Sequence, residues 1–179
     1  VVGPAGGRAG GGVGGWCRRG APSVLGGLAG SVAGLVAVTP AAGYSGPMGA
    51  IVLGLVVGVV CLFFCTVVKN ALGYDDSLDV FGVHCVGGTF GAIATGLFAS
   101  SAINPAVADG MGGLFITGDV GLVIAQLKAV LLTYAIGAVG SVVCLTVAGA
   151  VTGGSRADED SEFAGLDLSQ HSENASFFG

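Results

Sequence analysis

The sequence predicts an all-α protein, a polytopic membrane helix bundle with about four transmembrane helices. Hydrophobic residues make up 53% of the chain and charged residues only 9%, and the mean hydropathy is +0.88. A soluble domain usually carries about a quarter charged residues. A surface so poor in charge would aggregate in water, so lipid is the expected solvent. The 36 glycines agree with this class, because membrane helices use glycine for close packing.

The first twenty residues differ from the rest of the chain. Residues 1–20 show no helical or strand period, and their many glycines make a helix costly. They also lack the apolar core of a signal peptide. We therefore expect a glycine-rich leader that is disordered or truncated.

Four long apolar runs follow this leader. Each is near or above the roughly 18–20 residues that span a bilayer core, whereas barrel strands would be shorter and would alternate. The runs cover about residues 22–39, 47–68, 80–99 and 122–151. We assign residues 21–151 to one transmembrane domain and the polar residues 152–179 to a cytoplasmic tail.

Basic residues border these runs on one side of the membrane only. With four spans, the following residues all fall on that side: Arg18, Arg19, Lys69 and Arg156. The opposite loops, 40–46 and 100–121, hold no Lys or Arg. By the positive-inside rule both termini should be cytoplasmic. Lys128 is the exception, and at the outer end of the fourth run its side chain can reach the interface.

Small residues recur every fourth position in each run. Such rows allow helix backbones to approach closely, which predicts a tight bundle. The rows are Gly26, Gly30 and Gly34; Gly54 and Gly58; Gly88, Ala92 and Gly96; and Gly137 and Ser141.

One histidine, His84, lies inside the third run. An ionisable group within a membrane span is costly and is a functional candidate by default. The alternative is a histidine whose ring is satisfied by a neighbouring carbonyl. Val80 lies four residues earlier on the same helical face, and Gly87 and Gly88 leave room beside the ring.

Acidic residues stand where the third run begins. Asp76, Ser77 and Asp79 can cap free N–H groups there and favour the positive end of the helix dipole. A hydrolase is not expected, because the chain has no G-x-S-x-G elbow and Ser77 and His84 point to different faces of one helix. We expect no enzyme activity.

The five cysteines form no C-x-x-C pair. Neither a zinc site nor a disulfide framework is expected, and most of these residues are interpreted as small buried hydrophobes. No metal or other cofactor is predicted. The net charge of −5 gives no indication of a nucleic-acid partner.

Three blocks of the sequence resemble the ammonium transporter family, in its Amt/Mep branch, which is related to the Rhesus proteins. They are "PSVLGGLAGSVAGLVAVTPAAGYSGPMGAIVLGLVVGVVCLFF", "LGYDDSLDVFGVHCVGGTFGAIATGLFA" and the tail "GLDLSQHSENAS". The similarity covers about residues 20–179. It implies the C-terminal four spans and the tail of an eleven-helix fold of about twice this length.

The resemblance implies a homotrimer in the cell membrane, with one narrow hydrophobic pore for ammonium or ammonia in each subunit. His84 matches the second of two pore histidines, and Val80 matches an apolar pore-lining position. The tail resembles a segment that contacts neighbouring subunits and carries regulation, with a possible cytoplasmic partner. Its matching residues are Gly165, Asp167, Ser169 and His171, and Ser169 aligns with a phosphorylatable threonine of plant relatives.

The chain departs from the family pattern at several positions. Cys85 stands where the family usually has glycine, and Ser172 and Ser176 replace an expected Gly and Tyr. Residues 1–20 stand where another span is expected, so we expect a fragment.

The leading function is ammonium conduction as part of a larger or assembled transporter. The alternatives are a non-conducting fragment that docks to or regulates full-length subunits, and a Rhesus-type gas channel, although the tail favours the Amt branch.

Overall fold

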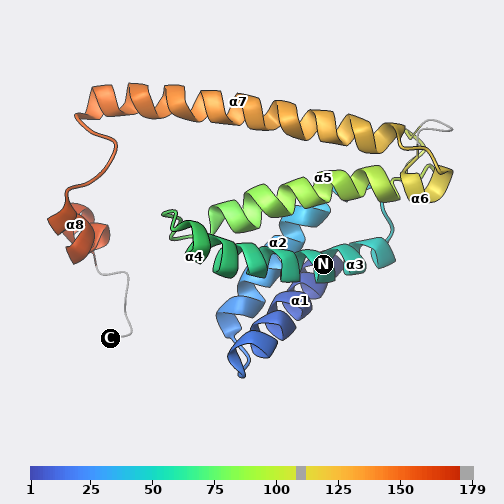
Figure 1. Cartoon of the computed structure of the whole chain (residues 1–179), viewed down its shortest axis with the longest axis horizontal. Helices are drawn as coiled ribbons and strands as arrows, with labels where there is room; N and C mark the ends of the chain where they lie inside the picture. The colour runs from blue at the N-terminus through green and yellow to red at the C-terminus, as the bar shows by residue number, and fades with distance from the viewer. Residues whose placement is uncertain (108–111, 174–179) are drawn as a thin grey trace. The chain divides into compact units, whose positions relative to one another are not determined.

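The computed structural model describes residues 1–107 and 112–173, and every regular element within these residues is helical. The chain divides into two compact units, Val1–Leu131 and Leu132–Gly179, which are described separately. The elements are α1 (Val2–Arg19), α2 (Val24–Ala41), α3 (Pro47–Phe63), η1 (Phe64–Val68), α4 (Lys69–Leu72), η2 (Phe81–Cys85), α5 (Val86–Phe98), α6 (Leu114–Thr117), α7 (Gly121–Thr152), α8 (Glu159–Ala164) and α9 (Leu166–His171), and Figure 1 labels α1 to α8. The two η elements are π-helical.

Four helical stretches are long and apolar enough to cross a membrane. They are Val24–Ala41, Pro47–Leu72, Phe81–Phe98 and Gly121–Thr152. Each coincides within a few residues with one of the four apolar runs, except that the second extends a turn further. The prediction of an all-α polytopic membrane bundle is thereby confirmed.

Local sequence signals explain where these spans begin and end. The Ser23 hydroxyl caps α2 by accepting a hydrogen bond from the Gly26 N–H at 3.2 Å, and Pro47 occupies the first turn of α3, where its missing N–H costs nothing. Gly73 ends the second span with φ 63°, and its N–H donates to the Lys69 carbonyl at 2.8 Å. A left-handed residue at this position is the usual glycine stop signal.

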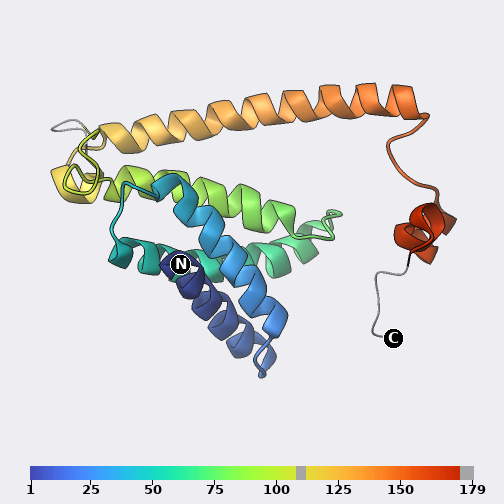
Figure 2. The same cartoon turned by 180° about the vertical axis from the view of Figure 1, so that it is seen from behind.

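The first helix, α1, corrects the expectation that residues 1–20 are disordered. Six of its glycines are buried: Gly3, Gly6, Gly7, Gly10, Gly11 and Gly15. Figures 1 and 2 show α1 running beside α2, and a Cβ added at Gly7 would lie only 2.9 Å from the Gly34 Cα. Low helix propensity is here outweighed by backbone contacts that only glycine permits.

Some of the small-residue rows make close contacts between helices, and others do not. Gly30 and Gly34 of α2, and Gly54 and Gly58 of α3, all lie against glycines of α1. In the third span the close approach to α2 is made by Gly91, whereas Gly88 has only a distant neighbour. In α7, nothing lies within 4 Å of a Cβ added at Gly137, and no residue of that helix is buried.

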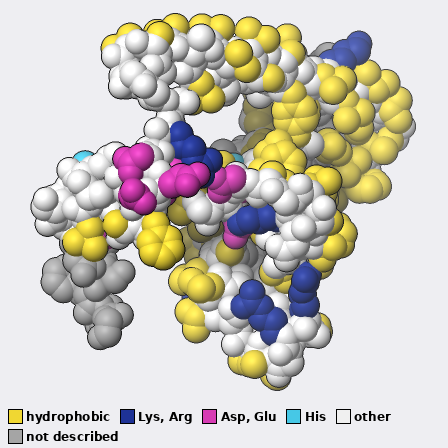
Figure 3. Space-filling view, turned by 60° about the vertical axis from the view of Figure 1, so that its left-hand side comes forward, with side chains coloured by type: hydrophobic (Ala, Val, Ile, Leu, Met, Phe, Trp, Pro, Cys, Tyr) yellow, Lys and Arg dark blue, Asp and Glu magenta, His cyan; other side chains and the backbone are white. Residues whose placement is uncertain are grey.

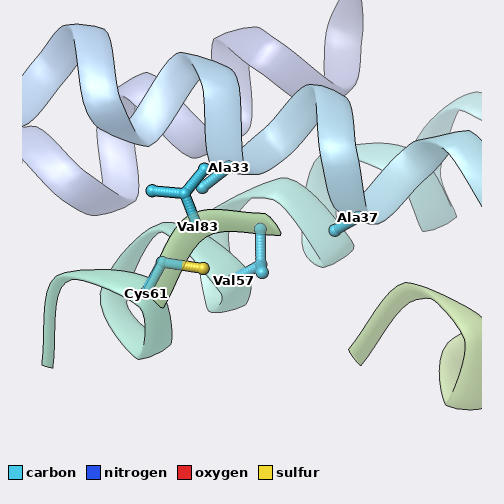
Figure 4. Packing of buried hydrophobic residues seen from close by; sticks show 5 residues of the cluster. All are labelled: Ala33, Ala37, Val57, Cys61 and Val83. Atoms are coloured by element: carbon cyan, nitrogen blue, oxygen red, sulfur yellow. The ribbon is translucent and has the colours of Figure 1, made fainter. Parts of the chain in front are cut away.

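The core of the first unit lies where α2, α3 and η2 meet. Ala33 and Ala37 of α2, Val57 and Cys61 of α3, and Val83 of η2 are all at most 6% exposed. Figure 4 shows the η2 backbone between α2 and α3, with the Val83 side chain directed toward Ala33 and with Cys61 on the other side of the η2 ribbon. Val83 therefore anchors the π-helical segment in the core.

The second unit contains the end of α7 and the tail helices α8 and α9. Asp158 caps α8 by accepting from the Ser161 N–H at 2.8 Å. Arg156 holds the same helix through two hydrogen bonds to the Glu162 carboxylate, of 2.7 and 2.9 Å.

In the face seen in Figure 3, hydrophobic side chains are spread widely and charged ones gather in a few places. That distribution fits a protein whose main solvent is lipid.

Candidate pore-lining site

The third span begins with the π-helical turn η2, which contains His84. The Val86 N–H donates to the carbonyls of Phe81 and Val83, so the turn is wider than in an α-helix. Single π-helical turns inside α-helices occur often at functional sites. The hydrophobic pattern alone does not reveal this turn, because it interrupts the 3.6-residue period at only one place.

His84 and Val80 are both exposed on the third span, and Val80 is 49% accessible. Between them, Gly82 and Val83 are buried. The His84 ring makes no hydrogen bond within residues 1–107 and 112–173. The alternative of a histidine satisfied by a neighbouring carbonyl therefore finds no partner for the ring in the described part of the chain.

Asp76 fixes the start of this span. Its two carboxylate oxygens accept hydrogen bonds from the N–H groups of Val80 and Phe81, each at 2.9 Å. These N–H groups have no partner inside the helix, so the carboxylate acts as a cap. Ser77 takes no part in these bonds.

Asp79 has a different role from Asp76. Its carboxylate forms an ion pair with Lys69 at 2.7 Å, and the same Lys69 ammonium also donates to the Asp76 carbonyl. In the sequence, Lys69 indicates only the orientation of the spans. One signal could have found this contact: a single basic residue at the end of an apolar span, followed by three aspartates within ten positions.

The two π-helical turns pack against one another through a glycine. A Cβ added at Gly82 in η2 would lie 3.1 Å from the Cys65 backbone nitrogen in η1. Real side chains rarely tolerate so short a contact, so only glycine allows this approach. The position of η2 is therefore fixed by α2, α3 and η1 together.

Tyr74 covers the end of η2. Its ring packs edge-on against Phe81, with ring centroids 5.5 Å apart. The hydroxyl group is buried and has no hydrogen-bond partner among the described residues. Burial of the hydroxyl, and next the nearby Asp76 carboxylate, raise the pKa of Tyr74.

The tail residues singled out from the sequence lie in and beside α9. Gly165 has φ 97°, and a Cβ there would lie 2.7 Å from an Asp167 carboxylate oxygen, so a larger residue would be strained. The Ser169 hydroxyl donates to the Gly165 carbonyl at 3.0 Å. The structure thus brings Gly165, Asp167 and Ser169 into one turn, while His171 is exposed at the helix end. Ser176 lies outside the described residues.

The other potential ligands do not gather. Within the described residues, no three His, Cys, Asp or Glu side chains are placed to hold a metal ion. Cys85, next to His84, is half-buried, and Cys61 is buried in the core. The geometry therefore offers one imidazole on an apolar helix and no metal centre in this part of the chain.

Comparison with known proteins identifies the type of protein to which this helix belongs. A sequence model of the Ammonium Transporter Family matches residues 2–176. The chain belongs to the ammonium transporter family. The match begins at residue 2, so it includes α1, whereas the sequence resemblance began near residue 20.

Individual relatives agree with this assignment. The chain is 41% identical over 160 residues to an ammonium transporter of Bacillus subtilis, covering 89% of this chain and 38% of that protein. It is 40% identical over 163 residues to the ammonium transporter Amt1 of Archaeoglobus fulgidus, covering 90% and 39%. These relatives are transporters, in agreement with the expectation that the chain has no enzyme activity.

Solved structures give the same fold. The crystal structure of Candida albicans Mep2 superposes with a TM-score of 0.73 at 31% identity, covering 94% of this chain and 38% of that one. Saccharomyces cerevisiae Mep2 gives a TM-score of 0.74 at 29% identity, covering 89% and 37%. The chain therefore spans less than two-fifths of the length of these relatives.

Proposed function

We propose that this chain contributes to ammonium conduction, with His84 lining a hydrophobic pore beside Val80. The observation that carries the proposal is the exposed imidazole on the apolar third span, without a hydrogen-bond partner in the described chain. The two relatives compared above are ammonium transporters, which supports ammonium as the substrate.

The proposed chemistry follows from the properties of the ion. A dry, apolar tube excludes hydrated ions because desolvation is costly. Ammonium can lose a proton and cross as ammonia, and an imidazole can both accept and donate the hydrogen bonds that ammonia needs. Potassium has no proton to lose, so selectivity does not require size discrimination.

The assembly and location follow the same proposal. We infer a homotrimer in the cell membrane, with both termini of the chain in the cytoplasm. The pore would need further helices, since the chain spans less than two-fifths of its relatives.

The test replaces the matching part of the Bacillus subtilis relative with residues 2–173 of this chain. Cells that lack their own ammonium uptake should grow on low ammonium when they express the chimaera. His84→Ala should abolish uptake or change its selectivity against potassium. His84→Glu, which offers another proton acceptor, should retain conduction with weaker selectivity.

A matched control is Cys144→Ala, which changes an exposed position of α7 and should leave growth unchanged. His84→Leu is the decisive variant, because it keeps an apolar side chain of similar size without a ring nitrogen. If the chimaera with His84→Leu transports ammonium with normal rate and selectivity, His84 is only a packing residue.

One observation favours a second candidate, a non-conducting chain that docks to full-length subunits. No residue of α7 is buried, and beyond its first turns, where Val123 lies against Gly96 of α5, its surface is available to lipid or to another protein. Co-expression of this chain with the intact Bacillus subtilis transporter separates the two candidates. A docking chain would lower uptake by the intact protein, whereas a chain that only conducts as part of a pore would not.

We also propose that the tail regulates conduction through Ser169. A phosphate on Ser169 would add about −1.5 to −2 charges two positions from Asp167, in the turn whose Gly165 carbonyl accepts the Ser169 hydroxyl. Repulsion would then open this turn. In the chimaera, Ser169→Asp should alter uptake, and Ser169→Ala is its uncharged control; unchanged uptake in the Asp variant would exclude this role.

A further inference from the structure

Lys69 is the residue that joins the second span to the start of the third. Its ammonium donates to the Asp79 carboxylate at 2.7 Å and also to the Asp76 carbonyl. The side chain is partly buried, with 25% of its surface accessible. One cation therefore holds both aspartates of the turn that precedes η2.

This turn needs the stabilising contacts of Lys69 because its backbone adopts an unfavourable conformation. Asp79 has φ 55°, a left-handed conformation that is unfavourable for residues other than glycine, although Asp and Asn tolerate it best. Asp79 also donates its N–H to the Asp76 carbonyl at 3.2 Å. The same carbonyl thus receives bonds from both Asp79 and Lys69.

From this turn the connection to His84 is short. The Asp79 carbonyl accepts the Val83 N–H at 2.9 Å, and Val83 precedes His84 in the chain. The Asp76 carboxylate meanwhile holds the N–H groups of Val80 and Phe81. The first three hydrogen-bonded N–H groups of the span, at Val80, Phe81 and Val83, are therefore all held by Asp76 and Asp79.

The opposite side of the connection is equally defined. Lys69 directly follows the π-helical turn η1, and η1 lies against η2 where Gly82 meets Cys65. Lys69 therefore lies in the last turn of the second span, directly after the turn that packs on η2.

We propose that Lys69 is a positioning residue for His84: by holding Asp76 and Asp79 it keeps η2 π-helical and so sets the orientation and depth of the imidazole. This inference rests on the proposed role of His84 in the pore. Without the ammonium, Asp79 can leave its left-handed conformation and the wide turn can close to an α-helical one. When a π-helical turn closes to an α-helical one, the turn contains one residue fewer. This rotates the remainder of the helix by about 100° and shifts it by about 1.5 Å. Either change would turn the ring away from its present direction.

The experiment observes His84 directly, so it does not depend on transport. The chain contains two histidines, and with ¹⁵N-labelled histidine in lipid nanodiscs each ring gives its own signals. His171, in the tail, is the internal reference. The variants are Lys69→Met, Lys69→Arg and Asp79→Asn, with Lys128→Met as the matched control at the other lysine of the chain.

We expect Lys69→Met to shift the His84 ring signals and to change the rate at which a maleimide modifies neighbouring Cys85, located by mass spectrometry. Lys69→Arg should restore both, because it keeps the charge and the donors. Asp79→Asn should shift the His84 signals as Lys69→Met does, since asparagine tolerates the left-handed backbone but lacks the charge. Lys128→Met should change neither reporter.

The inference is overturned if folded Lys69→Met and Asp79→Asn leave the His84 signals and the Cys85 rate as in the parent chain. It is also overturned if Lys69→Arg behaves like Lys69→Met. If the parent chimaera fails to take up ammonium while Lys69→Met and Asp79→Asn still shift the His84 signals, the pore role of His84 fails and the positioning role of Lys69 stands, so the two proposals fail in different ways.

Discussion

At the scale of single residues, Tyr74 contains a polar group that lowers the free energy of unfolding. Its hydroxyl group is buried without a hydrogen-bond partner in the described chain, while its ring packs on Phe81. A buried, unsatisfied hydroxyl costs about 1–3 kcal/mol. Tyr74→Phe keeps the ring contact and removes the hydroxyl, so we expect it to raise the free energy of unfolding by about 1 kcal/mol.

Unfolding of the chain in detergent micelles would measure this change. Tyr44→Phe is the control, because Tyr44 is 37% exposed and its hydroxyl can remain in contact with water. Tyr44→Phe should leave the stability unchanged. A loss of stability in the Tyr74 variant would mean that this hydroxyl is hydrogen-bonded after all.

How well the role of a single residue could be predicted depends on how far along the sequence its contacts reach. Asp76 binds N–H groups only four and five positions away, so the position of an acidic residue before an apolar run suffices to suggest a cap. Lys69 meets Asp79 across ten positions and a turn. That contact depends on the left-handed Asp79 and on the two packed spans, which no local pattern specifies.

At the scale of helices, α1 gives the sharpest contrast between buried and open positions. A Cβ at Gly7 would lie 2.9 Å from both the Cα and the nitrogen of Gly34, whereas nothing lies within 4 Å of a Cβ at Gly12. We expect Gly7→Ala to lower the free energy of unfolding by about 1–3 kcal/mol, because α1 and α2 must move apart. Unfolding in micelles is again the measurement.

Gly12→Ala is the matched control in the same helix. It meets no neighbour and removes a glycine from a helix interior, so it should stabilise the chain by about 0.5–1 kcal/mol. If both variants change stability by the same amount and in the same direction, α1 does not pack on α2 through Gly7.

The elements differ in how well their sequences predict them. The four spans follow from continuous apolarity, which neither turns nor soluble helices share, and their ends carry plain signals such as Ser23, Pro47 and Gly73. The helix α1 could not be predicted from propensity, because its buried glycines are stabilised only by close contacts with α2 and α3, at glycines and also at Ile51 and Leu55. The π-helical turns also escaped prediction, since one inserted residue barely alters the hydrophobic period.

The tail helix α8 should respond to pH. Hydrogen bonds from the Ser161 N–H and hydroxyl lower the pKa of Asp158, and the hydrogen bond from Arg156 lowers the pKa of Glu162. Because both values are lower in the folded tail, their stabilisation is complete above the ordinary carboxyl pKa of about 4. It is lost as the pH falls through the lowered values.

We therefore expect the α8 amide signals in NMR spectra to lose their helical shifts on acidification below about pH 4. In the double variant Asp158→Asn, Glu162→Gln, neither group titrates, and asparagine can still cap the helix. Its α8 signals should keep their helical shifts in this range. Equal pH dependence in both proteins would exclude these carboxyl groups as the cause.

At the scale of the whole molecule, the number and order of spans determine where each loop lies. If the four candidate spans Val24–Ala41, Pro47–Leu72, Phe81–Phe98 and Gly121–Thr152 all cross the bilayer, residues 73–80 are expected on the same side as the tail and residues 99–107 on the other. By the positive-inside rule, we expect the first of these sides to be the cytoplasm. The depth of Lys69, and with it the entrance to the proposed pore, depends on this orientation.

Cysteine labelling in intact cells tests the orientation. In a chain whose exposed Cys17 and Cys144 are replaced by serine, single cysteines are introduced by Ser77→Cys, Ser101→Cys and Ser155→Cys, all at exposed positions. A membrane-impermeant maleimide should label only the variant with Cys at 101 from outside, and the other two only after the membrane is opened. Labelling of 77 and 101 from the same side would mean that the third span does not cross the bilayer, and His84 would then lie outside any pore. Labelling of 77 and 155 from outside, with 101 protected, would invert the protein and place the Lys69 turn at the outer entrance.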